Sequence, residues 1–194
     1  FKEKLEVILG GAFSLQKGFY TANYVEVITD VAFWNYFKNS VIIIIFALFF
    51  LLMFCSFAAY PLSRFKFKLR NFIFLVIVAS MSIPIHVTMI PVFQMAIKTH
   101  LYDTIWVLVP TAVAFALPMS VFIMTGFMEG IPVELEEAAD IDGCGRYGRF
   151  FKVIFPLSTP GLSTLAIYNG VNIWNEFIFA FTLTQSEANR TLPL

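Results

Sequence analysis

A charged segment between two hydrophobic stretches carries the residue types that could do chemistry in this chain. Residues 129–160 hold nine of the 26 charged side chains of a 194-residue sequence in which hydrophobic residues make up 59%. Acidic residues come first and basic residues follow, and Cys144 has no histidine or second cysteine near it. The segment lacks both a metal-ligand set and a nucleophile with its base. Its composition therefore indicates a water-facing element with no catalytic residue.

The order of residues in this segment predicts a first helix from Pro132 to Asp142. Proline is tolerated in the first turn of a helix, because its missing N–H has no intrahelical partner there. Three glutamates then place negative charge near the positive end of the helix: Glu134, Glu136 and Glu137. Glycines that tolerate positive φ follow and would end the helix and turn the chain: Gly143, Gly145 and Gly148.

A second helix is predicted after the turn, with an aromatic face to bury and a charged face to present. Its apolar residues recur at i, i+3, i+4 and i+7, which is the spacing of one helix face: Tyr147, Phe150, Phe151 and Ile154. In the first helix the apolar stripe is narrow and partly built of alanine, which favours close packing: Ile131, Leu135 and Ala138. Pro156 and Pro160 close the second helix.

The segment resembles the EAA loop of ABC importer permeases. Glu137-Ala138-Ala139 is followed after three residues by Gly143, and after nine more by Val-Ile-Phe-Pro at residues 153–156. Further positions match the carbohydrate-uptake class of these permeases, in particular the shorter permease subunit of maltose-type systems: Asp142, Phe150, Val153, Pro156 and Pro160. The sequence has Val153 where isoleucine is commonest in the family and Phe155 where leucine is.

The resemblance implies that this loop docks into a cleft of a cytoplasmic ATPase subunit. Glu137 would pair with a cation of the ATPase, Ala138 and Ala139 would permit close approach, and Gly143 would make the turn. The residues expected to couple the two proteins are Glu134, Glu137, Ala138, Ala139, Asp142, Gly143, Phe150, Val153, Pro156 and Pro160. The alternative interpretation is a solvated amphipathic loop without a partner.

The elements that must position this loop are membrane helices, as the composition indicates. Charged residues make up 13% of the chain, about half the proportion in soluble domains, and 24 positions are phenylalanine. The formal net charge is zero, so nothing favours nucleic acid as a partner. Cys55 lies in a hydrophobic stretch and Cys144 in the charged one, so no disulfide framework is predicted.

Four hydrophobic stretches are long enough to cross a bilayer as helices, at about residues 41–60, 72–93, 104–128 and 161–184. The second contains Pro84 and Pro91, so kinks are expected there. We therefore predict an all-α, polytopic transmembrane helical bundle, which the resemblance identifies with the type I ABC importer permease fold. Residues 1–194 form a single permease domain, and family members have about six spans, so one span is expected before Phe1 and one after Leu194.

Charge predicts which loops face the cytoplasm. The loop after the first span carries four cations and no anion: Arg64, Lys66, Lys68 and Arg70. Residues 129–160 contain three more cations, whereas the intervening loop carries one lysine, Lys98. By the positive-inside tendency, the loop after the first span and residues 129–160 are both cytoplasmic, and the loop that carries Lys98 is not. Residues 1–40 are predicted to be an extracytoplasmic segment.

The fourth predicted span carries polar side chains that are costly inside a bilayer. They recur on one side of an apolar helix: Asn169, Asn172, Asn175 and Glu176. Such groups line a water-filled path or contact a second subunit, but they also act as hydrogen bonds between helices, and the sequence leaves both roles open. The first role makes them candidates for the translocation path or a subunit interface.

The sequence thus predicts a membrane-spanning permease subunit of an ATP-driven, binding-protein-dependent importer, for sugars or oligosaccharides, in a bacterial or archaeal cell membrane. No phosphate-binding loop is present, so the chain is expected to bind no cofactor itself. The resemblance implies cytoplasmic ABC ATPase subunits that hold ATP and Mg, a second permease subunit and an extracytoplasmic solute-binding protein. A permease for another solute is the first alternative, and a secondary transporter that uses Glu176 is the second.

Overall fold

The computed structural model describes residues 22–29 and 31–194, and in these residues the chain forms helices and loops without a strand. The predicted all-α class is confirmed. The α-helices are α2 Ala22–Thr29, α3 Val31–Arg64, α4 Arg70–Ser80, α5 Ile85–Lys98, α6 Leu108–Glu129, α7 Glu134–Ile141, α8 Arg146–Arg149, α9 Phe155–Leu157, α10 Thr159–Trp174 and α11 Ile178–Leu183. Two short 3₁₀ helices, η1 Ile105–Val107 and η3 Glu187–Asn189, and one π-helix, η2 Phe150–Ile154, complete them.

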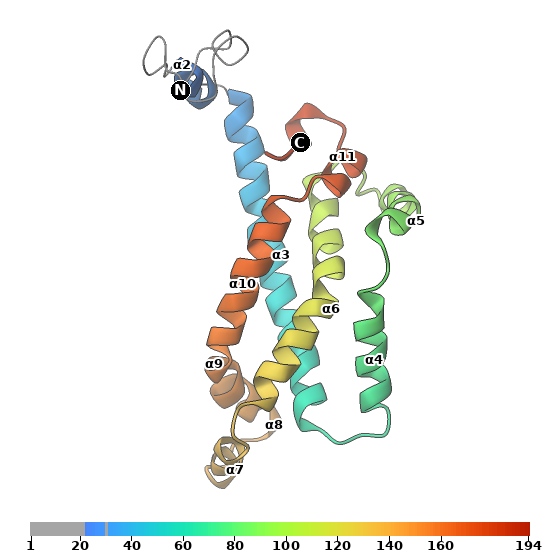
Figure 1. Cartoon of the computed structure of the whole chain (residues 1–194). Coiled ribbons are helices and arrows are strands. Elements are labelled where there is room, and N and C mark those ends of the chain that lie inside the picture. The colour runs from blue at the N-terminus through green and yellow to red at the C-terminus, as the bar shows by residue number, and fades with distance from the viewer. Residues whose placement is uncertain (1–21, 30) are drawn as a thin grey trace, which may run out of the picture.

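The helices α3, α6 and α10 run side by side along the length of the molecule (Figure 1). Along α3, every fourth residue is buried, which is the spacing of one helix face: Ile43, Ala47, Leu51, Cys55 and Ala59. Several of these side chains are small, so neighbouring backbones approach closely, as is typical of helix packing in membranes. Gly161 does the same for α10, because a Cβ there would lie 2.8 Å from Cγ of Phe127.

Two helical stretches are long and apolar enough to cross a membrane, Val31–Arg64 and Ile105–Glu129. The first begins ten residues before the predicted span at 41–60. The helix α3 thus includes residues 31–40 of the segment predicted to be extracytoplasmic, and residues 1–21 and 30 of that segment lie outside the described part of the chain.

The second predicted span, residues 72–93, is broken. Its two halves, α4 and α5, meet at an angle of 96°. Pro84 explains the break, since it has no N–H to donate and disfavours helical geometry in the residue before it. Its own backbone is extended, with ψ of 134°. Pro91, by contrast, lies inside α5.

The fourth predicted span, residues 161–184, also differs from the structure. The helix α10 ends at Trp174, and a new short helix, α11, begins at Ile178. At its other end, α10 meets the preceding helical stretch, residues 146–157, at an angle of 65°. Together the two are long and apolar enough to cross a membrane as one bent span. The reason for the break after Trp174 lies in Glu176, described below.

The bundle has two differently built ends, here called the α7 end and the α11 end (Figure 1). At the α7 end lie α7, α8 and the loop between α3 and α4, and at the α11 end lie α2, α5, α11 and the last residues of the chain. Asn39 and Ser40, both buried near the start of α3, fix that last stretch: Asn39 donates to the carbonyls of Ala188 and Arg190, and Ser40 Oγ accepts from Leu192 N–H.

Candidate functional site

Helix α7 carries most of the predicted docking residues, and it presents them at the tip of the α7 end (Figure 1). Among its eight residues only Glu136 and Ala139 are buried. The predicted helix from Pro132 to Asp142 is thus shortened by two residues at its start and one at its end. Of the predicted apolar stripe, Ile131 is buried against the bundle, whereas Leu135 and Ala138 are exposed.

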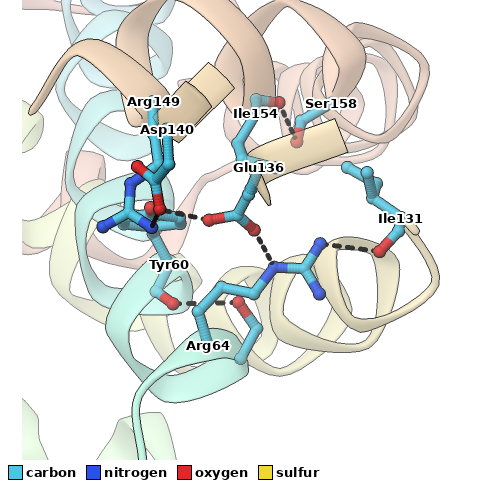
Figure 2. Close-up of polar contacts among 9 residues, drawn as sticks. Tyr60, Arg64, Ile131, Glu136, Asp140, Arg149, Ile154 and Ser158 are labelled. Carbon is cyan, nitrogen blue, oxygen red and sulfur yellow. Dashed lines mark hydrogen bonds and ion pairs between the residues drawn. The ribbon is translucent and has the colours of Figure 1, made fainter. Parts of the chain in front are cut away.

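The buried acid of α7 is neutralised by the last residue of α3. Nε of Arg64 lies 2.5 Å from Oε1 of Glu136, and the two side chains are only 8% and 7% exposed. Tyr60 Oη–H donates to Oε2 of Glu136 at 3.0 Å, and a terminal nitrogen of Arg64 donates to the Ile131 carbonyl at 2.7 Å. Figure 2 shows Arg64 reaching from α3 to both Glu136 and Ile131. Helix α7 is therefore joined to α3 by a buried ion pair.

The turn after α7 has the geometry expected at Gly143. This glycine has φ of 80°, in the left-handed region that favours glycine. Its N–H bonds the Asp140 carbonyl at 3.0 Å, and the N–H of Cys144 bonds the Ala139 carbonyl at 2.9 Å. This pair of bonds is the Schellman motif, which satisfies the last carbonyls of a helix. The prediction that Gly143 ends the first helix is confirmed.

Aromatic contacts hold the second half of the segment against α3. Phe150 is buried, with ring centroids 5.1 Å from Tyr60 and 5.4 Å from Phe57. Ile154 is fully buried as well, whereas Tyr147 is 84% exposed and Phe151 53% exposed. The expected aromatic face is thus only half buried, because residues 150–154 form a π-helix that changes the side-chain spacing.

The predicted coupling residues separate into an outer and an inner set. The outer set is exposed: Glu134, Glu137, Ala138, Asp142, Gly143, Pro156 and Pro160. The inner set is buried or half-buried: Ala139, Phe150 and Val153. Across the turn, Arg149 pairs with Asp140 at 2.8 Å, so α8 is tied to α7 as well. The members of the outer set on α7, Glu134, Glu137 and Ala138, are acidic or small and are not covered by any other described part of the chain.

Arg64 and Glu136 are the functional candidates that the sequence analysis missed. Arg64 counted there only as one cation of a basic loop, and Glu136 only as one of three acids at a helix start. One signal for Glu136 was available in the sequence. It lies three residues before Ala139, which belongs to the EAA motif, so the two residues share a helix face.

The predicted polar face of the fourth span is divided between α10, which carries Asn169 and Asn172, and the turn after it, which carries Asn175 and Glu176. Asn169 is buried on α10, where its Nδ2 donates to Ser120 Oγ of α6 at 3.1 Å. Asn172 and Asn175 are exposed and donate to carbonyls one turn back. Glu176 accepts from the backbone N–H groups of Phe179 and Ala180 at 2.8 and 3.1 Å.

These contacts assign different roles to the four residues. Asn169 is a hydrogen bond between helices, which is the second of the two roles that the sequence left open. Glu176 caps the start of α11, and this cap explains why the predicted span is interrupted. Both carboxylate oxygens of Glu176 thus serve as acceptors for backbone N–H groups of α11.

A pocket of about 340 Å³ lies between α6 and α10. Its polar lining comes from Thr111, Tyr168, Asn169, Asn172 and Glu176, and its apolar lining includes Phe115 and Met119. Amide and carboxylate oxygens beside aromatic rings can hydrogen-bond and stack against a polar, ring-shaped solute. Asn172 is the predicted path residue whose side chain is both exposed and at this pocket.

Asp103 organises the opposite end of the bundle. Its carboxylate accepts from the N–H groups of Gln185 and Ser186, at 2.7 and 2.8 Å, and from the Ser186 hydroxyl. Its own carbonyl accepts from Asn189 Nδ2 at 2.6 Å. The Ser186 and backbone hydrogen bonds lower the pKa of Asp103 to about 2. Its φ of 56° is unusual for a non-glycine residue, but aspartate tolerates this region.

Comparison with known proteins places this geometry in a family. A putative ABC transporter permease protein (ORF2) of Caldicellulosiruptor sp. is 45% identical over 194 residues, which is all of this chain and 70% of that protein. The arabinooligosaccharides transport permease AraQ of Halalkalibacterium halodurans is 39% identical over 89% of this chain and 61% of its own length. The melibiose/raffinose/stachyose import permease MelC of Bacillus subtilis is 36% identical over 89% and 63%.

A solved structure gives the same result for the fold. One chain of a bacterial ABC transporter involved in the import of the acidic polysaccharide alginate superposes with a TM-score of 0.84 at 26% identity, over 98% of this chain and 66% of that chain. This chain thus spans 61 to 70% of the length of these four proteins. The family model described as a binding-protein-dependent transport system inner membrane component matches residues 52–194, most of the chain, so the protein belongs to that family of membrane permeases.

Proposed function

We propose that this chain is part of the permease of an ATP-driven importer for sugars or oligosaccharides in a bacterial or archaeal inner membrane. The support is its similarity to AraQ and MelC, whose names give arabinooligosaccharides and melibiose, raffinose and stachyose as their solutes. In this proposal the protein crosses the membrane several times and works with a second permease subunit and an extracytoplasmic solute-binding protein. The α7 end faces the cytoplasm, in agreement with the cations of the loop between α3 and α4.

The observation that carries the proposal is the exposed face of α7. The side chains of Glu134 and Glu137 are both exposed. Both residues belong to the first turn of α7, which lies at the tip of the bundle. Small Ala138 lies between them and the turn, so a partner surface can approach the helix closely. Acidic side chains with small neighbours suit a cleft lined by arginine or lysine. We infer that a cytoplasmic ATPase subunit supplies this cleft.

The chain's part in transport would be mechanical. When two ATPase subunits close around ATP and Mg, which they hold, α7 moves with the cleft that contains it. Because α7 is joined to α3, and α3 packs along α6 and α10, a displacement of α7 changes the packing of the whole bundle. Two packings of these helices would then open the pocket beside Asn172 to one side of the membrane or the other.

Co-purification tests the docking proposal. Glu137→Lys reverses one charge on the exposed face of α7, and we expect it to remove the ATPase subunit from a complex that wild-type full-length protein retains. Glu26→Lys is the matched control, since Glu26 is an exposed acid on α2 at the other end of the bundle. Retention of the ATPase by both variants, or its absence from the wild type, would contradict the proposal.

Uptake measurements test the solute class and the energy source. Membrane vesicles that contain the whole transporter should accumulate a labelled oligosaccharide when supplied with ATP, and collapse of the proton gradient should leave uptake unchanged. Accumulation driven by the proton gradient without ATP would instead support a secondary transporter. Competition by an amino acid or a peptide, but by no sugar, would assign the permease to another solute.

A further inference from the structure

The buried cluster of Arg64, Glu136 and Tyr60 is separate from the exposed face that the proposed ATPase contact uses. We propose that Arg64 and Glu136 form the joint through which a movement of α7 reaches the membrane helices. The inference rests on the proposed function, since it concerns how docking at α7 changes the bundle. In this role both are positioning residues: they touch neither solute nor nucleotide, and they fix where α7 stands relative to α3.

Arg64 is placed to hold three segments at once. It is the last residue of α3, and its guanidinium contacts Glu136 of α7 and the carbonyl of Ile131, which lies between α6 and α7. A guanidinium offers several N–H donors in one rigid plane, so it can bond a carboxylate and a carbonyl in fixed directions (Figure 2). Helix α7 is therefore held against α3 at its middle and at its entry.

Helix α7 has little else to hold it against the bundle. Its apolar side chains point outward, as Leu135 is 42% exposed and Ile141 87% exposed. Ala139 is the one buried apolar residue of the helix, and it offers a single methyl group for packing. A force that acts on α7 consequently reaches the body through the turn, through the short helices that follow, and directly through Glu136.

Because the ion pair is buried, it should stay intact when α7 moves, so that a displacement of α7 is passed on to α3. Neither Nε of Arg64 nor Oε1 of Glu136 has a hydrogen bond to another residue among those described, so each depends on the other. A buried charge without its partner is strongly disfavoured, so the pair stays together when α7 moves. An exposed pair lacks this property, because water replaces either partner. Arg70 and Glu129, at the same end of the bundle, make such an exposed pair at 2.6 Å, with side chains 33% and 48% exposed.

The test measures ATP hydrolysed per solute imported, in the complete transporter reconstituted into liposomes. Glu136→Gln keeps the shape of the side chain and an acceptor oxygen but removes the charge. We expect the complex to assemble and hydrolyse ATP, with a ratio of ATP to solute raised about tenfold, the size of effect reached when a coupling network is weakened. Glu129→Gln, which breaks the exposed pair, is the matched control and should leave the ratio unchanged.

Two further variants keep the inference testable if Glu136→Gln does not assemble. Tyr60→Phe removes one hydrogen bond to Glu136 and leaves the ring in its aromatic contacts, and we expect it to raise the ratio about twofold. Exchange of the two charges, Arg64→Glu with Glu136→Arg, should recover part of the coupling that Arg64→Glu alone loses. Wild-type ratios in Glu136→Gln, or in Tyr60→Phe where the former does not assemble, would overturn the inference. ATP-independent uptake by the wild type would instead overturn the proposed function.

Discussion

The two ends of the bundle each depend on one acidic residue, but they neutralise its charge in different ways. At the α7 end, Glu136 is buried and pairs with the side chains of Arg64 and Tyr60. At the α11 end, Asp103 is partly exposed and accepts from the backbone and hydroxyl of residues 185 and 186. A carboxylate held by backbone N–H groups fixes a loop in one conformation, whereas a pair of long side chains connects two separate helices.

This difference matches what each end must do. The segment from Thr184 to Leu194 is anchored at many points, by Asp103, Asn39 and Ser40, so the α11 end forms a fixed surface. Helix α7 is anchored to α3 at one ion pair and to α8 at another, so it can move as a unit with the helices to which it is tied. Local stability should therefore respond differently when each acidic centre is disrupted.

The largest effect is expected from Arg64→Ala. This change leaves Glu136 buried without its cation, and breaking one partner of a buried pair costs about 3–5 kcal/mol. The measurement is the free energy of unfolding of the purified full-length protein in mixed detergent micelles. Glu129→Ala is the control, because it breaks only the exposed pair with Arg70, and such pairs contribute about 0–1 kcal/mol. Equal losses in the two variants would remove the distinction between the buried and the exposed pair.

A smaller, pH-dependent effect is expected at Asp103. Because the pKa of Asp103 is lowered to about 2 in the folded protein, the ionised carboxylate stabilises its loop at any pH above its ordinary pKa of about 3.9. The stabilisation declines below that value and is lost as the pH falls through about 2. Hydrogen exchange of the amides of Gln185 and Ser186 should accelerate, relative to the intrinsic rate, over this window only.

The variant Asp103→Asn supplies the comparison for that measurement. It keeps one acceptor oxygen but loses the charge, so we expect a loss of about 1 kcal/mol of local stability near neutral pH and no acid transition in the two amides. Amide exchange in α7 is the control: because α7 lies at the far end of the bundle, its exchange should be the same in Asp103→Asn and in the wild type. An acid transition that survives in Asp103→Asn would show that another group controls the loop.

The sequence predicted the helical class and the charged turn well because both depend on local signals. Long uncharged stretches indicate membrane helices, and a glycine after an acidic helix indicates a left-handed turn, as Gly143 has. The break at Pro84 was predicted only as a kink. Proline shows where a helix is weakened, but the angle of 96° depends on the packing of the two halves.

The buried pair and the cap on α11 were beyond prediction from the sequence for a different reason. Arg64 and Glu136 are 72 positions apart, and neither residue type carries a sign of burial, since both are common on surfaces. Glu176 matched the spacing of a polar helix face, which made it a candidate path residue. Its carboxylate instead caps a new helix that begins two residues later, at Ile178. An acidic cap inside a hydrophobic stretch cannot be told by sequence from a polar residue on a continuous span.

The smallest effect is expected from Asn169→Leu, at a site between the two ends. Its hydrogen bond with Ser120 joins α10 to α6, and such bonds between membrane helices average about 0.6 kcal/mol. Uptake by the variant should stay near the wild-type rate with a slight loss of stability in the micelle assay. Asn172→Leu, on the same helix but exposed at the pocket, should reduce uptake and leave stability unchanged. The reverse pattern would place the solute path at Asn169 and make Asn172 the structural residue, because only one of the two side chains has its amide committed to another helix.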